Sequence, residues 1–140
     1  MLYERLDRYT PYAIAALRIA TALIFMLHGT QKLFGFPAPP QGGLPPLFSL
    51  FGIGAVLELV GGFLILVGAF TRPVAFILAG EMAVAYWMFH APRNLYPVLN
   101  GGDASILYCF VFLLLVFTGP GALSIDGLRG GRTHRPALGR

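Results

Sequence analysis

The residues of this 140-residue chain that could do chemistry lie inside its apolar stretches. Arg18, Glu58 and Glu81 each interrupt a different run of hydrophobic residues. An ionisable side chain in hydrocarbon costs at least a few kcal/mol unless it is paired or faces a wet cavity. Because two carboxyls share a single deep arginine, one of them needs a proton of its own. We therefore expect these three residues to form a buried polar centre that binds a quinone carbonyl or exchanges protons.

The same three residues also have a purely structural interpretation. An arginine paired with a glutamate can fix the register of packed helices without any further role. The sequence does not tell which glutamate would meet Arg18.

A second polar group, the outer polar layer, is expected nearer the far end of the first apolar stretch. Its members are His28, Gln31, Lys32 and Asp103. The imidazole of His28 suits a proton shuttle or a ligand, although a hydrogen-bonded histidine near the interface is the plainer interpretation. Asp103 is first of all expected to cap the N-terminus of the helix that follows it.

Metal and thiol chemistry find little support in the sequence. His28 and His90 do not make a metal or haem site alone, and on a straight helix His90 lies about 180° from Glu81. Cys109 is the one cysteine of the chain, which excludes an intramolecular disulfide and indicates packing. No metal and no intrinsic cofactor are predicted, so an electron carrier would be a diffusible quinone or a partner's cofactor.

The composition is that of a membrane protein. Hydrophobic residues make up 56% of the chain, charged residues only 11%, and the mean hydropathy is +0.72. A soluble domain has about 25% charged residues and could not cover its surface with so few. The net charge of +4 arises from residues clustered at the chain ends, which favours membrane topology over nucleic-acid binding.

Long apolar segments must position the polar residues. After an amphipathic cytoplasmic lead-in over 1–10, residues 11–123 are expected to form an all-α membrane domain, a four-transmembrane-helix bundle. Its spans are predicted at 11–34, 51–70, 74–91 and 104–118. The proline- and glycine-rich segment 35–50 cannot continue a helix and is either a lid or a passive linker. The basic tail 124–140 is predicted to be cytoplasmic and disordered.

Basic residues predict the orientation of the bundle. Most arginines lie on the side of the bundle that carries the two tails and the turn at 71–73, whereas the other side holds only Lys32 and Arg93. With four spans, this asymmetry predicts that both termini are cytoplasmic. The arginines of the two tails and of the turn at 71–73 are Arg5, Arg8, Arg72, Arg129, Arg132, Arg135 and Arg140.

Glycines are expected to pack the helices. Gly54, Gly61 and Gly68 recur every seven residues in the second apolar stretch, where Gly62 follows Gly61. Small residues on one stripe let helices approach closely in a membrane. Packing within the bundle and association of two copies both explain the pattern, so a homo-oligomer stays open.

Three segments of the chain together resemble the DoxX family of small four-span membrane proteins. They are LR…HGTQKLFG from Leu17, ELVGGFLILVGAFTRPVAFILAGEMAVA from Glu58, and GPGALSIDG from Gly119. The resemblance covers residues 12–128 and implies a four-helix bundle in the bacterial cytoplasmic membrane. Asp103 stands where relatives often have a glutamate. The residues that carry the resemblance are Arg18, His28, Gly29, Lys32, Gly35, Glu58, Gly61, Gly62, Gly68, Arg72, Gly119, Gly121, Ser124 and Asp126.

The resemblance also implies a function. The family takes its name from a subunit associated with a quinol oxidase and with thiosulfate:quinone oxidoreduction. Another member is described as the membrane part of a complex with superoxide dismutase and a sulfurtransferase. We therefore expect an accessory subunit of a quinone-linked or oxidative-stress redox system, with a redox partner enzyme and no catalytic motif of its own. A proton-coupled carrier or channel for small solutes, and a scaffold that docks a partner enzyme, are the alternatives.

Overall fold

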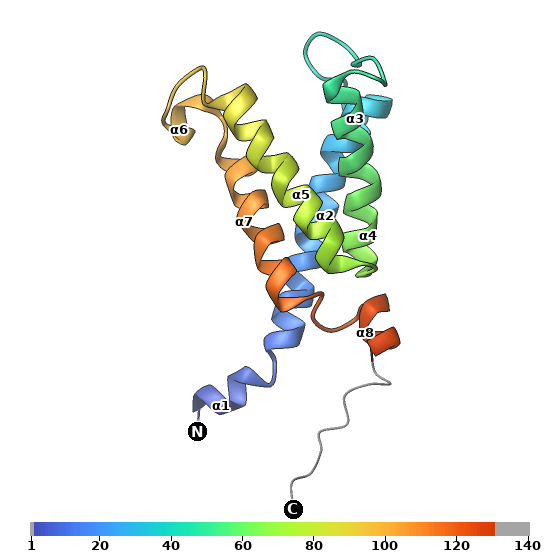
Figure 1. Ribbon diagram of the computed structural model, residues 1–140, viewed down its shortest axis with the longest axis vertical. Helices are drawn as coiled ribbons and strands as arrows, with labels where there is room; N and C mark the ends of the chain where they lie inside the picture. Colours follow the sequence, from blue (N-terminus) through green and yellow to red (C-terminus); the bar gives the residue numbers. More distant parts are fainter. Residues whose placement is uncertain (1, 131–140) are drawn as a thin grey trace, which may run out of the picture.

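The computed structural model describes the backbone of residues 2–130 and the side chains of residues 5–130. Within this part of the chain the secondary structure is helical, with no strand (Figure 1). The basic residues Arg132, Arg135 and Arg140 of the expected tail lie outside the described residues.

Long apolar helices make up most of the fold. The first is α2, Thr10–Phe34. The second joins α3 (Leu50–Val56), the π-helical turn η1 (Leu57–Gly61) and α4 (Gly62–Val67). These two, and the helix over Thr71–His90, are long and apolar enough to cross a membrane.

The third long helix joins α5 (Thr71–Ala85) to the π-helical turn η2 (Tyr86–His90). The apolar helix α7 (Asp103–Thr118) is shorter. Side chains such as Phe76 and Phe117 remain 66% and 74% exposed, as expected for helices whose outer faces contact lipid.

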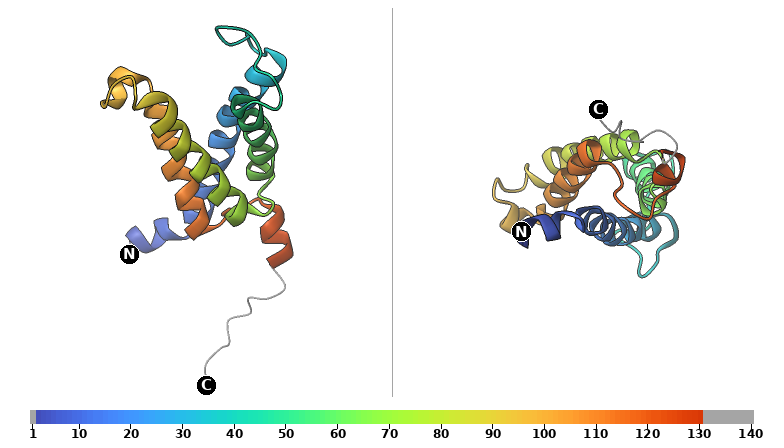
Figure 2. Two further views of the ribbon diagram at one scale, coloured as in Figure 1. Left: turned by 45° about the horizontal axis from the view of Figure 1, so that its top comes forward. Right: turned by 90° about the horizontal axis from the view of Figure 1, so that it is seen from below.

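The helices are arranged as two pairs that diverge toward one end. The helix α2 packs on α3, η1 and α4, whereas α5 packs mainly on α7 (Figures 1 and 2). The pairs meet at the end that carries α1 (Leu2–Asp7) and α8 (Ile125–Gly130). A fully buried core fills this junction with residues from four helices: Ala22, Phe25, Ile65, Leu78, Phe112 and Leu115.

The opposite end of the molecule carries two connections. The segment between α2 and α3 has no regular helix, as its prolines and glycines predict. The connection between η2 and α7 contains the short helix α6, Pro97–Asn100.

The start of the expected disordered tail is ordered in the structure. Ile125–Gly130 form α8, and Asp126 accepts hydrogen bonds from the backbone N–H groups of Phe70 (2.9 Å) and Thr71 (2.8 Å). The prediction of disorder was therefore wrong for these residues. The carboxylate satisfies N–H groups at the start of α5 that have no partner within the helix.

The glycines of the predicted stripe lie in different surroundings. A Cβ at Gly61 would stand 2.8 Å from Leu78 of α5, and one at Gly62 would stand 2.6 Å from Met26 of α2. Gly68 ends α4 with φ +65°, a backbone conformation that favours glycine. A Cβ at Gly54 would instead stand 3.2 Å from Oε1 of Glu81, and Gly54 lines a cavity.

Candidate functional site

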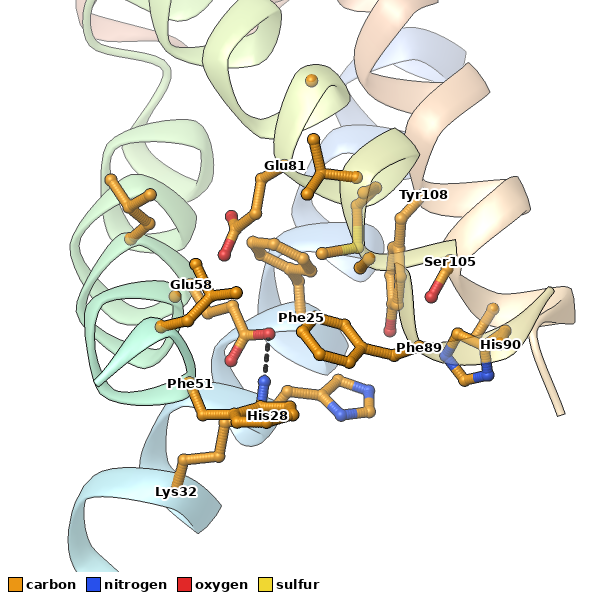
Figure 3. Close-up of a pocket in the computed structure, with 18 of the residues that line it drawn as sticks. Phe25, His28, Lys32, Phe51, Glu58, Glu81, Phe89, His90, Ser105 and Tyr108 are labelled. Carbon is orange, nitrogen blue, oxygen red and sulfur yellow. Dashed lines mark hydrogen bonds and ion pairs between the residues drawn. The ribbon is translucent and has the colours of Figure 1, made fainter. Parts of the chain in front are cut away.

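A cavity of about 580 Å³ lies between the two diverging helix pairs (Figure 3). Its walls come from α2, α3, η1, α5, η2 and the start of α7. The polar and ionisable residues that line it are His28, Lys32, Glu58, Glu81, His90, Arg93, Ser105 and Tyr108.

An ion pair between Lys32 and Glu58 forms one side of the cavity. The Nζ atom of Lys32 donates to Oε1 of Glu58 at 2.6 Å, and the two side chains are 25% and 5% exposed. Glu58 projects from the π-helical turn η1, and its second oxygen, Oε2, is buried without a hydrogen-bond partner. The pair therefore provides a hydrogen-bond partner for one of the two carboxylate oxygens of Glu58.

Glu81 lines the same cavity as Glu58. Figure 3 shows the Glu81 side chain extending from α5 on the side of η1, whereas the carboxyl of Glu58 points toward Lys32. Glu81 makes no hydrogen bond or ion pair with any residue that the structure describes, and its Oε2 atom is buried. Two carboxyls thus share one lysine, and Glu81 must meet a proton, a water or a ligand.

Aromatic rings cover much of the remaining wall. Phe51 of α3 and Phe89 of η2 are in contact, with ring centroids 4.6 Å apart. Deeper in the cavity, Tyr108 packs edge-on against Phe25 (5.1 Å) and His28 (5.9 Å). This lining suits a ligand with a flat or bulky apolar body and a small number of polar atoms.

Apolar residues of α3, η1 and α5 also line the cavity. Four of them are partly exposed: Ile53 (50%), Leu57 (36%), Ile77 (54%) and Val84 (49%). This side of the cavity is therefore apolar.

His90 lines the cavity together with Glu81, contrary to expectation. The sequence interpretation placed it on the opposite face because it assumed a straight α-helix. The π-helical turn Tyr86–His90 adds residues to one turn and rotates His90 toward the cavity. Its Nδ1 atom lies 3.1 Å from the carbonyl of Asn100.

Arg18 is separated from the expected buried polar centre. Its fully buried guanidinium bonds the carbonyls of Ile65 (2.8 Å) and Leu66, at the end of α4. It also donates to three carbonyls of the loop before α8: Pro120 (2.8 Å), Ala122 (3.2 Å) and Leu123 (2.8 Å). The predicted pairing with Glu58 or Glu81 was wrong, and Arg18 instead joins chain segments at the closed end.

The outer polar layer is only partly assembled. Lys32 and His28 line the cavity, whereas Gln31 is half-buried outside its lining. Asp103 is exposed as the first residue of α7, whose N-cap is Gly102 and not Asp103. The N–H of Gly102 donates to Asn100 Oδ1 at 2.7 Å, so Asn100 organises this helix start.

Sequence reasoning missed Tyr108, Ser105 and Phe89 as cavity residues. Each lies in a stretch that reads as uniformly apolar or interfacial, so nothing marks its inward side. Within the described residues, no group of three or more His, Cys, Asp or Glu side chains is placed to hold a metal ion.

Comparison with known sequences supports the family resemblance. The sequence model of the DoxX family matches residues 13–91, which include Lys32, Glu58 and Glu81. The chain belongs to the DoxX family. No solved structure matches it.

The chain is similar to several bacterial proteins. The chain is 42% identical over 127 residues to an uncharacterized protein of Haemophilus influenzae, covering 88% of this chain and 95% of that protein. It is 32% identical over 127 residues to the inner membrane protein YphA of Escherichia coli, covering 83% and 89%. It is 32% identical over 126 residues to the inner membrane protein YqjF of the same organism, covering 79% and 87%. With its long apolar helices, this DoxX protein is a multi-pass protein of the bacterial inner membrane.

Proposed function

We propose that the cavity binds a membrane-soluble quinone and that the protein is an accessory subunit of a quinone-linked or oxidative-stress redox system. The observation that carries this proposal is a cavity walled by aromatic rings and lined by two carboxyls, of which only Glu58 is paired with Lys32. Its volume of about 580 Å³ lies within the usual range for small-molecule sites.

The residues present fit such a ligand. A quinone ring is flat and apolar, as the walls formed by Phe25, Phe51 and Phe89 require. The ammonium of Lys32 uses one donor on Glu58 and has further N–H donors for a ligand oxygen. The partly exposed apolar residues between α3 and α5 leave room for an isoprenoid tail to extend into lipid.

A bound quinone would supply two-electron redox chemistry, with electrons exchanged by a partner redox enzyme. In this proposal the protein's own residues have two tasks. The aromatic walls orient the ring, and Glu81 holds or releases a proton beside it.

The proposal includes the topology of the chain. Four spans, α2, α3–α4, α5–η2 and α7, place α1 and α8 at one end, where Arg5, Arg8 and Arg129 are found. The excess of arginine at this end favours a cytoplasmic location of both termini. Reporter fusions at either end test this orientation.

The deciding experiment is mass spectrometry of the lipids and quinones retained by gently purified protein. We expect quinone enriched over the bulk membrane for the wild type and lost in the double variant Glu58→Gln/Glu81→Gln. The variant Asp103→Asn, which removes an exposed carboxyl outside the cavity, is the matched control. No enrichment in the wild type contradicts quinone binding.

The shape of the cavity favours a second candidate, a proton-coupled carrier. The cavity opens where the helix pairs diverge, while the buried core and Arg18 close the other end. Such a one-sided opening is one of the states that alternating access requires. This candidate predicts proton flux in liposomes that Glu58→Gln or Glu81→Gln abolishes and Asp103→Asn preserves.

A further inference from the structure

We infer that the cavity is a binding site for lipophilic organic cations, whose positive charge takes the place of a proton on Glu81. The inference goes beyond quinone binding. It also names the chemical class of the solute for the carrier candidate. Transport of the cation rests on that candidate, whereas binding of the cation does not.

The first argument is the charge balance of the cavity. Lys32 is committed to Glu58 at 2.6 Å, and Glu81 has no partner among the described residues. Glu58 is only 4% exposed, and its carboxyl points toward Lys32 with the Oε2 atom left unpartnered (Figure 3). With both carboxyls ionised, Glu58, Glu81 and Lys32 together carry one net negative charge inside the membrane domain. Arg93 also lines the cavity, but it is exposed, so that water screens its charge. A cation or a proton beside Glu81 balances the charge locally.

The second argument is the chemistry of the walls. The rings of Phe25, Phe51, Phe89 and Tyr108 line the same cavity as Glu81. Aromatic faces attract cations, and the attraction is stronger where the contact is desolvated. A small hydrated ion needs six or more oxygen ligands in place of its water, and most of this lining is apolar. A bulky cation with a delocalised or shielded charge fits the apolar lining better.

The third argument is the route of entry. The residues Ile53, Leu57, Ile77 and Val84 are apolar, partly exposed and part of the cavity lining. Lipophilic cations partition into membranes, and this apolar side of the cavity suits their entry from the bilayer. Charged or titratable groups of the same cavity, Arg93, His28 and His90, also line it. None of these three is an anion, and Glu58 is paired with Lys32, which leaves Glu81 as the anionic target.

Binding and proton release are therefore coupled. When the cation binds, Glu81 gives its proton to the solvent, and no covalent bond of the ligand changes. The coupling is reciprocal. If the bound cation lowers the affinity of Glu81 for a proton, a proton on Glu81 lowers the affinity for the cation by the same factor.

The test uses the full-length protein in detergent and tetraphenylphosphonium as the probe. Equilibrium dialysis measures binding, and a pH indicator in weakly buffered solution measures proton release. We expect saturable binding by the wild type and about one proton released per cation bound. Glu81→Gln should weaken binding at least tenfold and abolish the release.

Controls separate the outcomes. Glu81→Asp keeps the charge and should keep proton release, whereas Asp103→Asn should behave as the wild type in both measurements. Phe51→Leu should weaken binding, unlike Phe76→Leu on the lipid-facing surface. Absence of binding by the wild type, or binding by Glu81→Gln with wild-type affinity, overturns the inference. Binding with proton release but without flux in liposomes leaves the site standing and removes the carrier.

Discussion

Lys32 and Glu58 form an ion pair of 2.6 Å that joins α2 to the π-helical turn η1 beside the cavity. The pair is asymmetric, because the glutamate side chain is 5% exposed and that of the lysine 25%. The lysine can therefore reach water, while the carboxylate depends on the lysine for compensation. This asymmetry determines which partner is more costly to lose.

Replacing Lys32 by methionine should destabilise the protein more than replacing Glu58 by glutamine. The first change leaves a buried carboxylate without its cation, which costs about 2 kcal/mol after allowance for partial exposure. For a domain of this size the midpoint of thermal unfolding should fall by about 6 °C. Circular dichroism of the detergent-purified variants measures this fall.

The double variant Lys32→Met/Glu58→Gln is the matched control for that prediction. Because it removes both charges, it should recover most of the stability that Lys32→Met loses. Additive losses would show that the two side chains do not interact in the folded protein.

Arg18 should be important for the stability of the protein but not for ligand binding in the cavity. Its guanidinium serves five backbone carbonyls from the end of α4 and the loop before α8. Lysine has a single ammonium and cannot reproduce this planar arrangement. Arg18→Lys should therefore lower the unfolding free energy by about 3 kcal/mol, since buried carbonyls lose their donors.

The exposed Arg129 provides the control for Arg18, and Arg129→Lys should change stability little. The folded fraction of Arg18→Lys should still bind tetraphenylphosphonium with near wild-type affinity. If Arg18→Lys were stable but did not bind tetraphenylphosphonium, Arg18 would belong to the binding site.

The positions of the long helices were largely predictable from the sequence. Runs of about 20 apolar residues bounded by prolines, glycines and arginines indicate where helices begin and end. The helix Thr10–Phe34 lies close to the predicted span 11–34, and α7 close to 104–118. Residue type alone also singled out Glu58 and Glu81 as inward-facing.

The partners of the polar residues were not predictable in the same way. Arg18 binds backbone carbonyls, which every residue carries and which no sequence pattern reveals. His90 faces the cavity because of the π-helical turn before it, whereas angular arithmetic assumes a constant 3.6 residues per turn. Lys32 reaches Glu58 because the two helices approach closely at a glycine of α2.

That glycine, Gly29, should not tolerate alanine. A Cβ there would lie 2.8 Å from both the carbonyl oxygen of Ala55 and the backbone nitrogen of Leu59. Backbone atoms of a packed helix cannot move aside cheaply, so Gly29→Ala should destabilise the protein by about 2 kcal/mol. Thermal unfolding measures the loss.

Gly80 offers the opposite case on α5, because an added Cβ meets nothing within 4 Å. Gly80→Ala should be neutral or stabilise the helix by about 0.5 kcal/mol. Equal effects at both positions would contradict the close approach of α2 to α3 and η1.

Asp126 should make the attachment of α8 sensitive to acid. Burial opposes ionisation of its carboxyl. The N–H groups of Thr71 and Phe70 and the charge of Arg129 outweigh this and lower the pKa of Asp126 below its ordinary value of 3.8. A carboxyl whose pKa is lowered by folding stabilises the folded state above its unfolded pKa. That contribution is lost as the pH falls through the folded pKa.

The stability difference between the wild type and Asp126→Asn should therefore be constant at neutral pH, at about 1 kcal/mol. It should shrink as the pH falls below about 4, because the wild-type carboxyl then becomes protonated and accepts the two N–H groups less well. Thermal unfolding of both proteins across this pH range measures the difference. A difference that persists undiminished well below that pH would show that the contact does not depend on the charge of Asp126, and that α8 is held mainly by the carbonyls that Arg18 binds.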